Sequence, residues 1–239
     1  MRSLEYAMKL YRERTGFVLL FSLPFIVALL IPTLISGPTY ISLGAVFLRT
    51  GSIPEIDPLG AAVMLFAYLI SMFLIAQSIV SITLLVKTKR TQTNPTTEVI
   101  NALRKYGITI FLAYTLAAVL ILIAQLLTFN LEFRGIILPI LMLLVSFGVF
   151  FVPQAMVIDG YRLGHAIDAS YSMVRKKAAD VLLWMVIGAL LLTMSELIFF
   201  LLPYPLGPYL VMLFNALFVL PFLVIYQAQI YMKKYTLAH

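Results

Sequence analysis

The sequence predicts an all-α polytopic membrane protein: six transmembrane helices as three pseudo-repeated hairpins, with interfacial helices on the cytoplasmic face. Three observations lead to this fold class. There are six long apolar segments, the basic residues alternate between the two sides of those segments, and an amphipathic helical pattern precedes every odd-numbered segment. In addition, 62% of the residues are hydrophobic and only 11% are charged, which is unlike an ordinary soluble domain.

A helix needs about 20 apolar residues to cross a hydrocarbon core about 30 Å thick. Segments of that length lie at about 17–36, 59–86, 107–129, 136–158, 181–202 and 209–232. The first has a long apolar run and no small-x-small cleavage site, so we expect it to stay as an anchor and not to be removed as a signal peptide. Little chain is left for a soluble domain, and we expect one membrane domain over residues 1–239.

The basic residues predict the orientation. Fifteen of the 17 lysine and arginine residues flank the apolar segments on one side, and only Arg49 and Arg134 lie on the other. The positive-inside rule places the basic side, and with it both termini, in the cytoplasm. We expect a multi-pass plasma-membrane protein whose formal charge of +7 reflects orientation and attraction to anionic lipid, with no nucleic-acid partner.

Each cytoplasmic stretch has apolar residues at helical spacing before the next odd-numbered segment. The positions are Leu4, Ala7, Met8 and Tyr11; Val99, Ala102, Leu103 and Tyr106; and Ile167, Ser170, Tyr171 and Val174. The chain is therefore read as three copies of one unit, at about 1–86, 94–158 and 162–232, although three unrelated helical loops would give the same pattern. In the long first outer loop, the short apolar run 41–48 indicates a surface-lying helix or a re-entrant segment.

Glu196 is the only ionisable side chain well inside an apolar segment. A charge there is costly, so we expect the carboxyl group to face the bundle interior and to find a partner. Asn215 lies at the same depth in the next segment and could hydrogen-bond to it, while Arg134 and Gln125 are other partners from the outer side. The pair is either a proton, cation or headgroup site or a structural hydrogen bond.

Other polar residues fall inside the apolar segments. The second segment has a polar stripe, and amide side chains lie near the cytoplasmic ends of the fourth and sixth segments, close to prolines; the residues are Ser71, Gln77, Ser78, Ser81, Gln154, Gln227 and Gln229. Small and amide side chains commonly join membrane helices, which favours packing. The alternative is an inward-facing polar cavity with broken helices, as in transporters.

Residues 150–183 read FFVPQAMVIDGYRLGHAIDASYSMVRKKAADVLL. A helix end with proline is followed by an Asp-Gly turn, the pattern Ala-x-x-x-Ser, a basic cluster and the next segment. This run resembles a broad group of six-span bacterial and archaeal membrane proteins that includes the membrane domain found beside glycerophosphodiester phosphodiesterases and related families of unknown function. The matching positions are Asp159, Gly160, Ala166, Ser170 and Arg175. The resemblance implies the fold and a bilayer association, but no activity.

The sequence predicts no catalytic, metal or cofactor site, since it has no HExxH spacing, phosphate loop or nucleophile elbow. We therefore expect a non-enzymatic membrane protein that is lipid-associated or is the membrane module of a complex, either with a partner protein or with its own copies. A small permease or the membrane subunit of an ATP-driven transporter is the alternative. A membrane-embedded enzyme would need Asp159, Arg162 and His165 gathered around a phosphate.

The hypothesis of lipid association assigns roles to two sets of residues on the cytoplasmic side. The basic residues beside the second and third amphipathic patterns are expected to contact anionic headgroups; they are Arg104, Lys105, Arg175, Lys176 and Lys177. The aromatic residues on the same patterns are expected to anchor the helices at the interface; they are Tyr11, Tyr106 and Tyr171. Both sets follow the general behaviour of amphipathic helices, whose apolar face enters the headgroup boundary.

Overall fold

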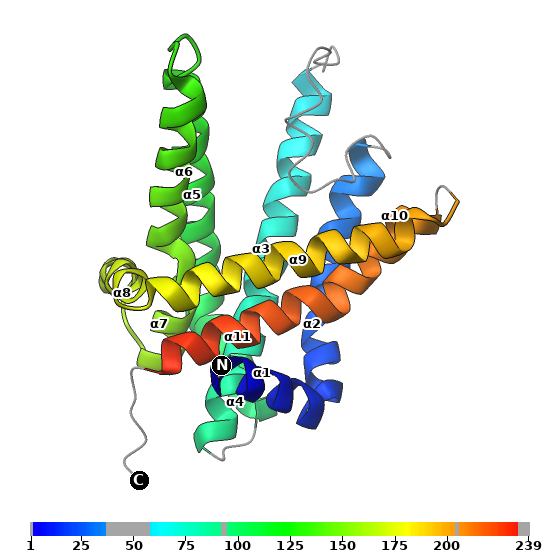
Figure 1. Ribbon diagram of the computed structural model, residues 1–239, viewed down its shortest axis with the longest axis vertical. Coiled ribbons are helices and arrows are strands. Elements are labelled where there is room, and N and C mark those ends of the chain that lie inside the picture. Colours follow the sequence, from blue (N-terminus) through cyan, green and yellow to red (C-terminus); the bar gives the residue numbers. More distant parts are fainter. Residues whose placement is uncertain (1, 37–57, 92–94, 204–205, 234–239) are drawn as a thin grey trace.

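A computed structural model describes residues 2–36, 58–91, 95–203 and 206–233, and Figure 1 shows that this part of the chain is a set of long helices. No strand occurs within these ranges. The α-helices are α1 (Arg2–Glu13), α2 (Thr15–Ser36), α3 (Pro58–Thr91), α4 (Pro95–Ala102), α5 (Ile108–Leu127), α6 (Arg134–Phe150), α7 (Val152–Asp159), α8 (Leu163–Lys176), α9 (Ala178–Phe200), α10 (Leu206–Phe214) and α11 (Leu220–Met232). Two π-helical segments, η3 (Leu103–Gly107) and η4 (Asn215–Val219), continue α4 into α5 and α10 into α11. The apolar run 41–48 lies outside the described residues.

Five helical stretches in these ranges are long and apolar enough to cross a membrane, and a sixth is added if α1 and α2 count as one broken span. The five are Pro58–Lys89, Glu98–Leu127, Arg134–Asp159, Ala178–Phe200 and Leu206–Met232. The all-helical fold is therefore confirmed over the described residues, and the five or six long apolar helices are those of a chain that could cross a membrane several times. The predicted segment ends fall close to the ends of the observed helices.

The chain bends by 95° between α1 and α2. The bend separates an amphipathic helix from an apolar one. This agrees with the amphipathic pattern that the sequence shows ahead of the first apolar segment. The Thr15 hydroxyl donates to the backbone carbonyls of Tyr11 at 2.8 Å and Arg12 at 3.1 Å. These carbonyls lie in the last turn of α1, where the helix itself provides no donor.

The second amphipathic pattern does not form a separate helix, which corrects the prediction of an independent interfacial helix there. Residues from Glu98 to Leu127 form one continuous helical stretch. No proline interrupts this stretch, and Gly107 keeps helical dihedrals of φ −58° and ψ −48°. The amphipathic part of this stretch therefore passes into the apolar part through a π turn at η3, without a bend between two separate helices. The third pattern does form its own helix, α8.

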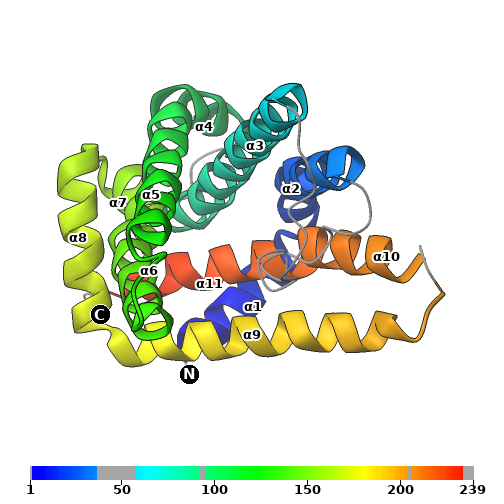
Figure 2. The same cartoon turned by 90° about the horizontal axis from the view of Figure 1, so that it is seen from above.

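Figures 1 and 2 show that the helix pairs α2–α3, α5–α6 and α9–α11 meet at one end and lie apart at the other. We call the meeting point the basic end, because Lys89, Arg104, Lys177 and Lys233 lie there. The pairs α5–α6 and α9–α11 cross steeply, so no single membrane normal runs along both and at least one pair is tilted.

The core lies at the basic end. The last turns of α3, the segment from Phe151 to Val157 and the last turns of α11 supply most of its fully buried residues, among them Leu85, Phe151 and Tyr226. The amphipathic helices cover this core from the side: α1 packs on α11, α4 packs on α3, and α8 packs on α6 and α7. Each of them thus contacts the second helix of a neighbouring pair.

Candidate functional site

The predicted headgroup-contact residues lie at two helix junctions of the basic end. Arg104 and Lys105 belong to η3, and the cluster Arg175–Lys177 joins α8 to α9. Four of the five side chains are exposed, and Lys177 is half-buried. Within the described ranges, none of the five forms an ion pair with a carboxylate. The Lys105 ammonium lies 5.1 Å from the centroid of the Tyr106 ring, which is a cation–π contact with the neighbouring residue.

Other lysines of the same end have partners inside the protein. The Lys233 ammonium lies 2.7 Å from a carboxylate oxygen of Asp180 and ties the end of α11 to the start of α9. Lys89 pairs with Glu13, which ties the end of α3 to the end of α1. The Lys87 ammonium donates to the Val157 carbonyl at 2.8 Å. The structure thus distinguishes these three lysines, which join neighbouring helices, from the five basic residues above, which form no ion pair with a described carboxylate.

The three predicted anchor tyrosines contact neighbouring helices. Tyr11 donates its hydroxyl hydrogen to the Leu217 carbonyl at 2.9 Å, and Tyr171 donates to the Leu144 carbonyl at 2.9 Å. The Tyr106 hydroxyl lies 3.7 Å from where a Cβ on Gly160 would stand. Burial raises the pKa of the Tyr11 hydroxyl above its ordinary value. The hydroxyls of Tyr11 and Tyr171 therefore bond to protein, while the residue Tyr171 remains 43% exposed.

The motif residues have structural roles. Ser170 is buried and spans the break between α6 and α7: it accepts a hydrogen bond from the Phe151 N–H at 2.9 Å and donates to the Phe147 carbonyl at 2.7 Å. Its hydroxyl thus bridges two groups that would bond directly in an unbroken α-helix. Ala166 on the same face is fully buried, which lets α8 approach closely.

The Asp-Gly turn that the sequence predicted forms the C-cap of α7. Gly160 has φ +75°, and its N–H bonds to the Met156 carbonyl, which is the 5→1 bond of an αL C-cap, while the Tyr161 N–H bonds to the Ala155 carbonyl. Asp159 accepts a hydrogen bond from the Tyr231 hydroxyl, which joins α7 to α11. Among the described residues, no three histidine, cysteine, aspartate or glutamate side chains are grouped to hold a metal ion.

The expected contact between Glu196 and Asn215 is not formed. Glu196 is exposed, whereas the residue before it, Ser195, is buried and donates its hydroxyl hydrogen to the Asn215 amide oxygen at 2.8 Å. Adjacent residues on an α-helix point about 100° apart, so only one of the two can face α10 and η4. Glu196 lies four residues before the end of α9, about 6 Å along the axis, so its carboxylate can reach the membrane surface.

Buried amides and an indole join other helices. Gln154 donates to the Gln227 amide oxygen at 3.2 Å, and Gln227 donates to the Phe150 carbonyl. The Trp184 indole N–H donates to the Leu223 carbonyl at 2.8 Å. The two glutamines fit the packing role that their positions predicted. The roles of Ser195 and Trp184 were missed, and the one signal for Trp184 is that it is the only tryptophan of the chain.

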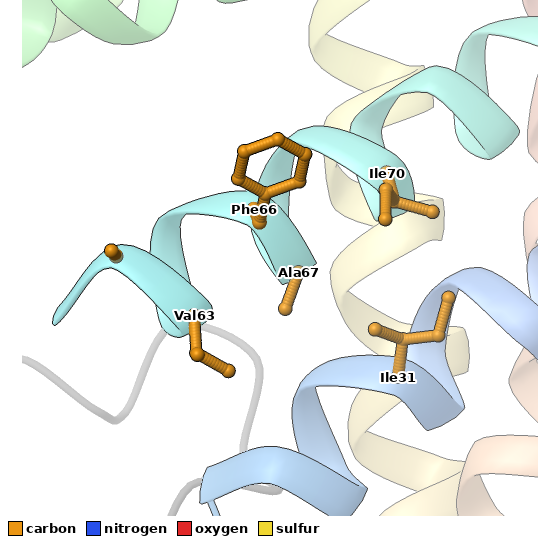
Figure 3. A pocket seen from close by; sticks show the side chains of 6 residues that line it. Ile31, Val63, Phe66, Ala67 and Ile70 are labelled. Atoms are coloured by element: carbon orange, nitrogen blue, oxygen red, sulfur yellow. The ribbon is translucent and has the colours of Figure 1, made fainter. Parts of the chain in front are cut away.

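A shallow apolar groove of about 300 Å³ lies between α2 and α3 (Figure 3). Its lining is Ile31, Ala62, Val63, Phe66, Ala67 and Ile70. All six side chains are apolar, so the groove offers contact to hydrocarbon but no polar group that would select or orient a ligand.

These features define an all-helical chain whose helices are long and apolar enough for a multi-pass membrane protein. Its basic end combines a tightly packed core with five basic side chains that form no ion pair with a described carboxylate. No family model, curated protein or solved structure matches the chain.

Proposed function

We propose that the protein is a non-enzymatic integral membrane protein of the plasma membrane that binds anionic lipid at its cytoplasmic face, by itself or as the membrane module of a partner complex. One observation carries this proposal: Arg104, Lys105 and the cluster Arg175–Lys177 have no acidic partner among the described residues, while neighbouring lysines are paired. Each basic residue close to an anionic membrane surface contributes about 1 kcal/mol of attraction.

The proposal includes a topology of six spans in three units, with both termini in the cytoplasm. In each unit an amphipathic helix leads into a pair of membrane helices, as in α1 with α2–α3 and α8 with α9–α11. The packing of α1 on α11, α4 on α3 and α8 on α6–α7 supports this arrangement, because each unit then leans on the one before it and the first closes on the last. In two units, a lysine at the end of the second membrane helix pairs with an acid near the start of the first membrane helix. Lys89 at the end of α3 pairs with Glu13 just before α2, and Lys233 at the end of α11 pairs with Asp180 in the first turn of α9.

The resemblance of residues 150–183 to membrane domains near lipid-processing enzymes agrees with this proposal. The motif residues Asp159, Gly160 and Ser170 cap, turn and bridge helices, which is the behaviour of a scaffold. A transporter with Glu196 as its intramembrane site is less well supported, because that carboxylate is exposed on α9 and lines neither the groove of Figure 3 nor the other hollow described below.

The test is native mass spectrometry of the protein released from nanodiscs that contain equal parts of phosphatidylglycerol and phosphatidylcholine. The wild type should retain phosphatidylglycerol preferentially, and the variant R175Q/K176Q/K177Q should lose several-fold of that preference. R134Q, which removes a cation from the opposite end, is the control. Equal lipid retention by the triple variant and the wild type would contradict the proposal, and a co-purifying ATPase subunit from the native membrane would favour a transporter.

A further inference from the structure

A shallow, open hollow of about 580 Å³ lies at the elbow between α1 and α2. It is lined by Glu13, Arg14, Gly16, Phe17 and Leu20. Its volume falls within the usual range of about 300–1,000 Å³ for sites that bind small ligands. Because the chain bends by 95° here, the hollow lies where an amphipathic helix passes into an apolar membrane helix.

The charge in the hollow is positive. Its only acid, Glu13, pairs with Lys89 and also lies 3.9 Å from the Lys9 ammonium, so two lysines share one carboxylate. Arg14 is half-buried, and its guanidinium lies 5.9 Å from the centroid of the Phe17 ring. Arg14 forms no ion pair with any acid in the described part of the chain. An anion that enters the hollow therefore meets an uncompensated guanidinium.

The remaining wall is apolar and open. Phe17 and Leu20 stand in the first turns of α2, one turn apart, and Leu20 is 54% exposed. Gly16 faces empty space, since a Cβ built there would meet no atom within 4 Å. The hollow is thus cationic where α1 ends and hydrocarbon-like along α2. That order of groups matches a molecule with an anionic head and an apolar chain.

We infer that the elbow binds one anionic phospholipid, with its phosphate at the Arg14 guanidinium and the start of an acyl chain along Phe17 and Leu20. The inference rests on the proposed orientation of the basic end toward lipid headgroups, but it uses none of the five headgroup-contact residues discussed above. A single fitted lipid at the elbow differs from the diffuse attraction exerted by Arg175–Lys177, because shape and charge both contribute.

Two matched pairs of variants test the site. G16L adds a side chain at the wall of the hollow, where a Cβ meets no atom within 4 Å, and G164L adds the same side chain at an exposed glycine of α8 whose Cβ also meets no atom within 4 Å. R14Q removes the charge from the hollow, and R12Q removes one from the neighbouring exposed position that does not line it. Leucine has a higher helix propensity than glycine, so neither leucine variant should unfold its helix.

Phosphatidylglycerol is titrated into the detergent-solubilised protein, and bound copies are counted by native mass spectrometry. The wild type, G164L and R12Q should bind one copy at least tenfold more tightly than the rest. G16L and R14Q should lose that copy, and inorganic phosphate should not displace it from the wild type. Tight binding that survives in G16L, or that is lost equally in G164L, would overturn the inference, as would displacement by phosphate.

R175Q/K176Q/K177Q separates this inference from the proposed function. If the elbow site exists, the triple variant keeps the single tight copy even when its general preference for phosphatidylglycerol falls. If the triple variant loses the tight copy while G16L keeps it, the lipid binds at the cluster and the elbow site is excluded.

Discussion

Tyr11 donates a hydrogen bond of 2.9 Å to the backbone carbonyl of Leu217, 206 positions along the chain. Tyr171 makes an equivalent bond to the carbonyl of Leu144, also at 2.9 Å. In both cases a tyrosine on an amphipathic helix reaches the second membrane helix of another pair. Leu217 lies in the π segment η4, where the regular i→i+4 bonding is interrupted and a carbonyl can accept an outside donor. The bond from Tyr11 therefore links the first helix of the chain to the last.

Replacement of Tyr11 by phenylalanine should destabilise the protein, because the Leu217 carbonyl loses its outside donor while the ring packing is kept. The expected loss is about 1 kcal/mol in the free energy of unfolding. Tyr6 lies on the same helix with 55% of its side chain exposed, so Y6F is the control and should change little. The measurement is denaturant-induced unfolding in detergent micelles. Equal effects of Y11F and Y6F would show that the bond contributes nothing.

The same bond should make stability depend on alkaline pH. Burial raises the pKa of Tyr11, so the stabilising contribution is complete below the unfolded-state value of about 10 and is lost as the pH rises through the higher folded-state pKa. The stability difference between the wild type and Y11F should therefore be constant near neutrality and shrink above about pH 10. Unfolding measured across that range checks this, and a difference that grows with pH would contradict it.

Ser170 should be intolerant of alanine. S170A removes the hydroxyl that bridges the Phe147 carbonyl and the Phe151 N–H, and both Ser170 and Phe151 are fully buried. The expected cost is about 1–3 kcal/mol, the penalty for unsatisfied buried polar groups. The neighbouring Ser172 is exposed, so S172A serves as the control and should fall within about 0.5 kcal/mol of the wild type. A thermal unfolding scan in which both variants match the wild type would refute the bridging role.

The lengths and ends of the membrane helices could be predicted from sequence, because bilayer thickness fixes the number of apolar residues and charge marks the ends. The turn at Gly160 could be predicted for a similar reason, since an Asp-Gly step at a helix end favours the left-handed residue of a C-cap. In these cases a local pattern in the sequence determines the local structure.

Features that depend on how a helix is rotated about its axis, or on which residues of other helices it packs against, could not be predicted from the sequence. Whether Ser195 or Glu196 faces Asn215 depends on how α9 rotates against η4, and the apolar pattern of α9 is uniform all round. The continuation of α4 into α5 was missed because the sequence shows the amphipathic pattern but not whether the chain bends after it. The ion pair of Lys233 with Asp180 joins residues 53 positions apart that have no local signal in common.

The ion pair between Lys233 and Asp180 should show coupling in a double-mutant cycle. Both side chains are partly buried, so each single charge reversal, K233D or D180K, should cost about 1–3 kcal/mol, between the values for surface and buried pairs. The double variant K233D/D180K should recover most of that loss, because the pair is re-formed with opposite polarity. K176D combined with D180K is the comparison, since Lys176 is exposed and forms no ion pair with a described residue. Additive losses in both double variants would show that the pair makes no net contribution.

Replacement of Asn215 should destabilise the protein more than replacement of Glu196, although a charged residue in an apolar helix would be expected to matter more than an amide. Asn215 is 6% exposed and bonded to Ser195, which is 1% exposed, so N215L should remove an interhelical hydrogen bond worth about 0.6–1.7 kcal/mol. E196Q should change stability by less than about 0.5 kcal/mol, because the carboxylate is exposed near the end of α9 and has no bonded partner among the described residues. Unfolding of both variants in the same detergent decides the question. A larger loss for E196Q than for N215L would mean that the carboxylate, and not Ser195, supplies the polar contact of the last helix pair.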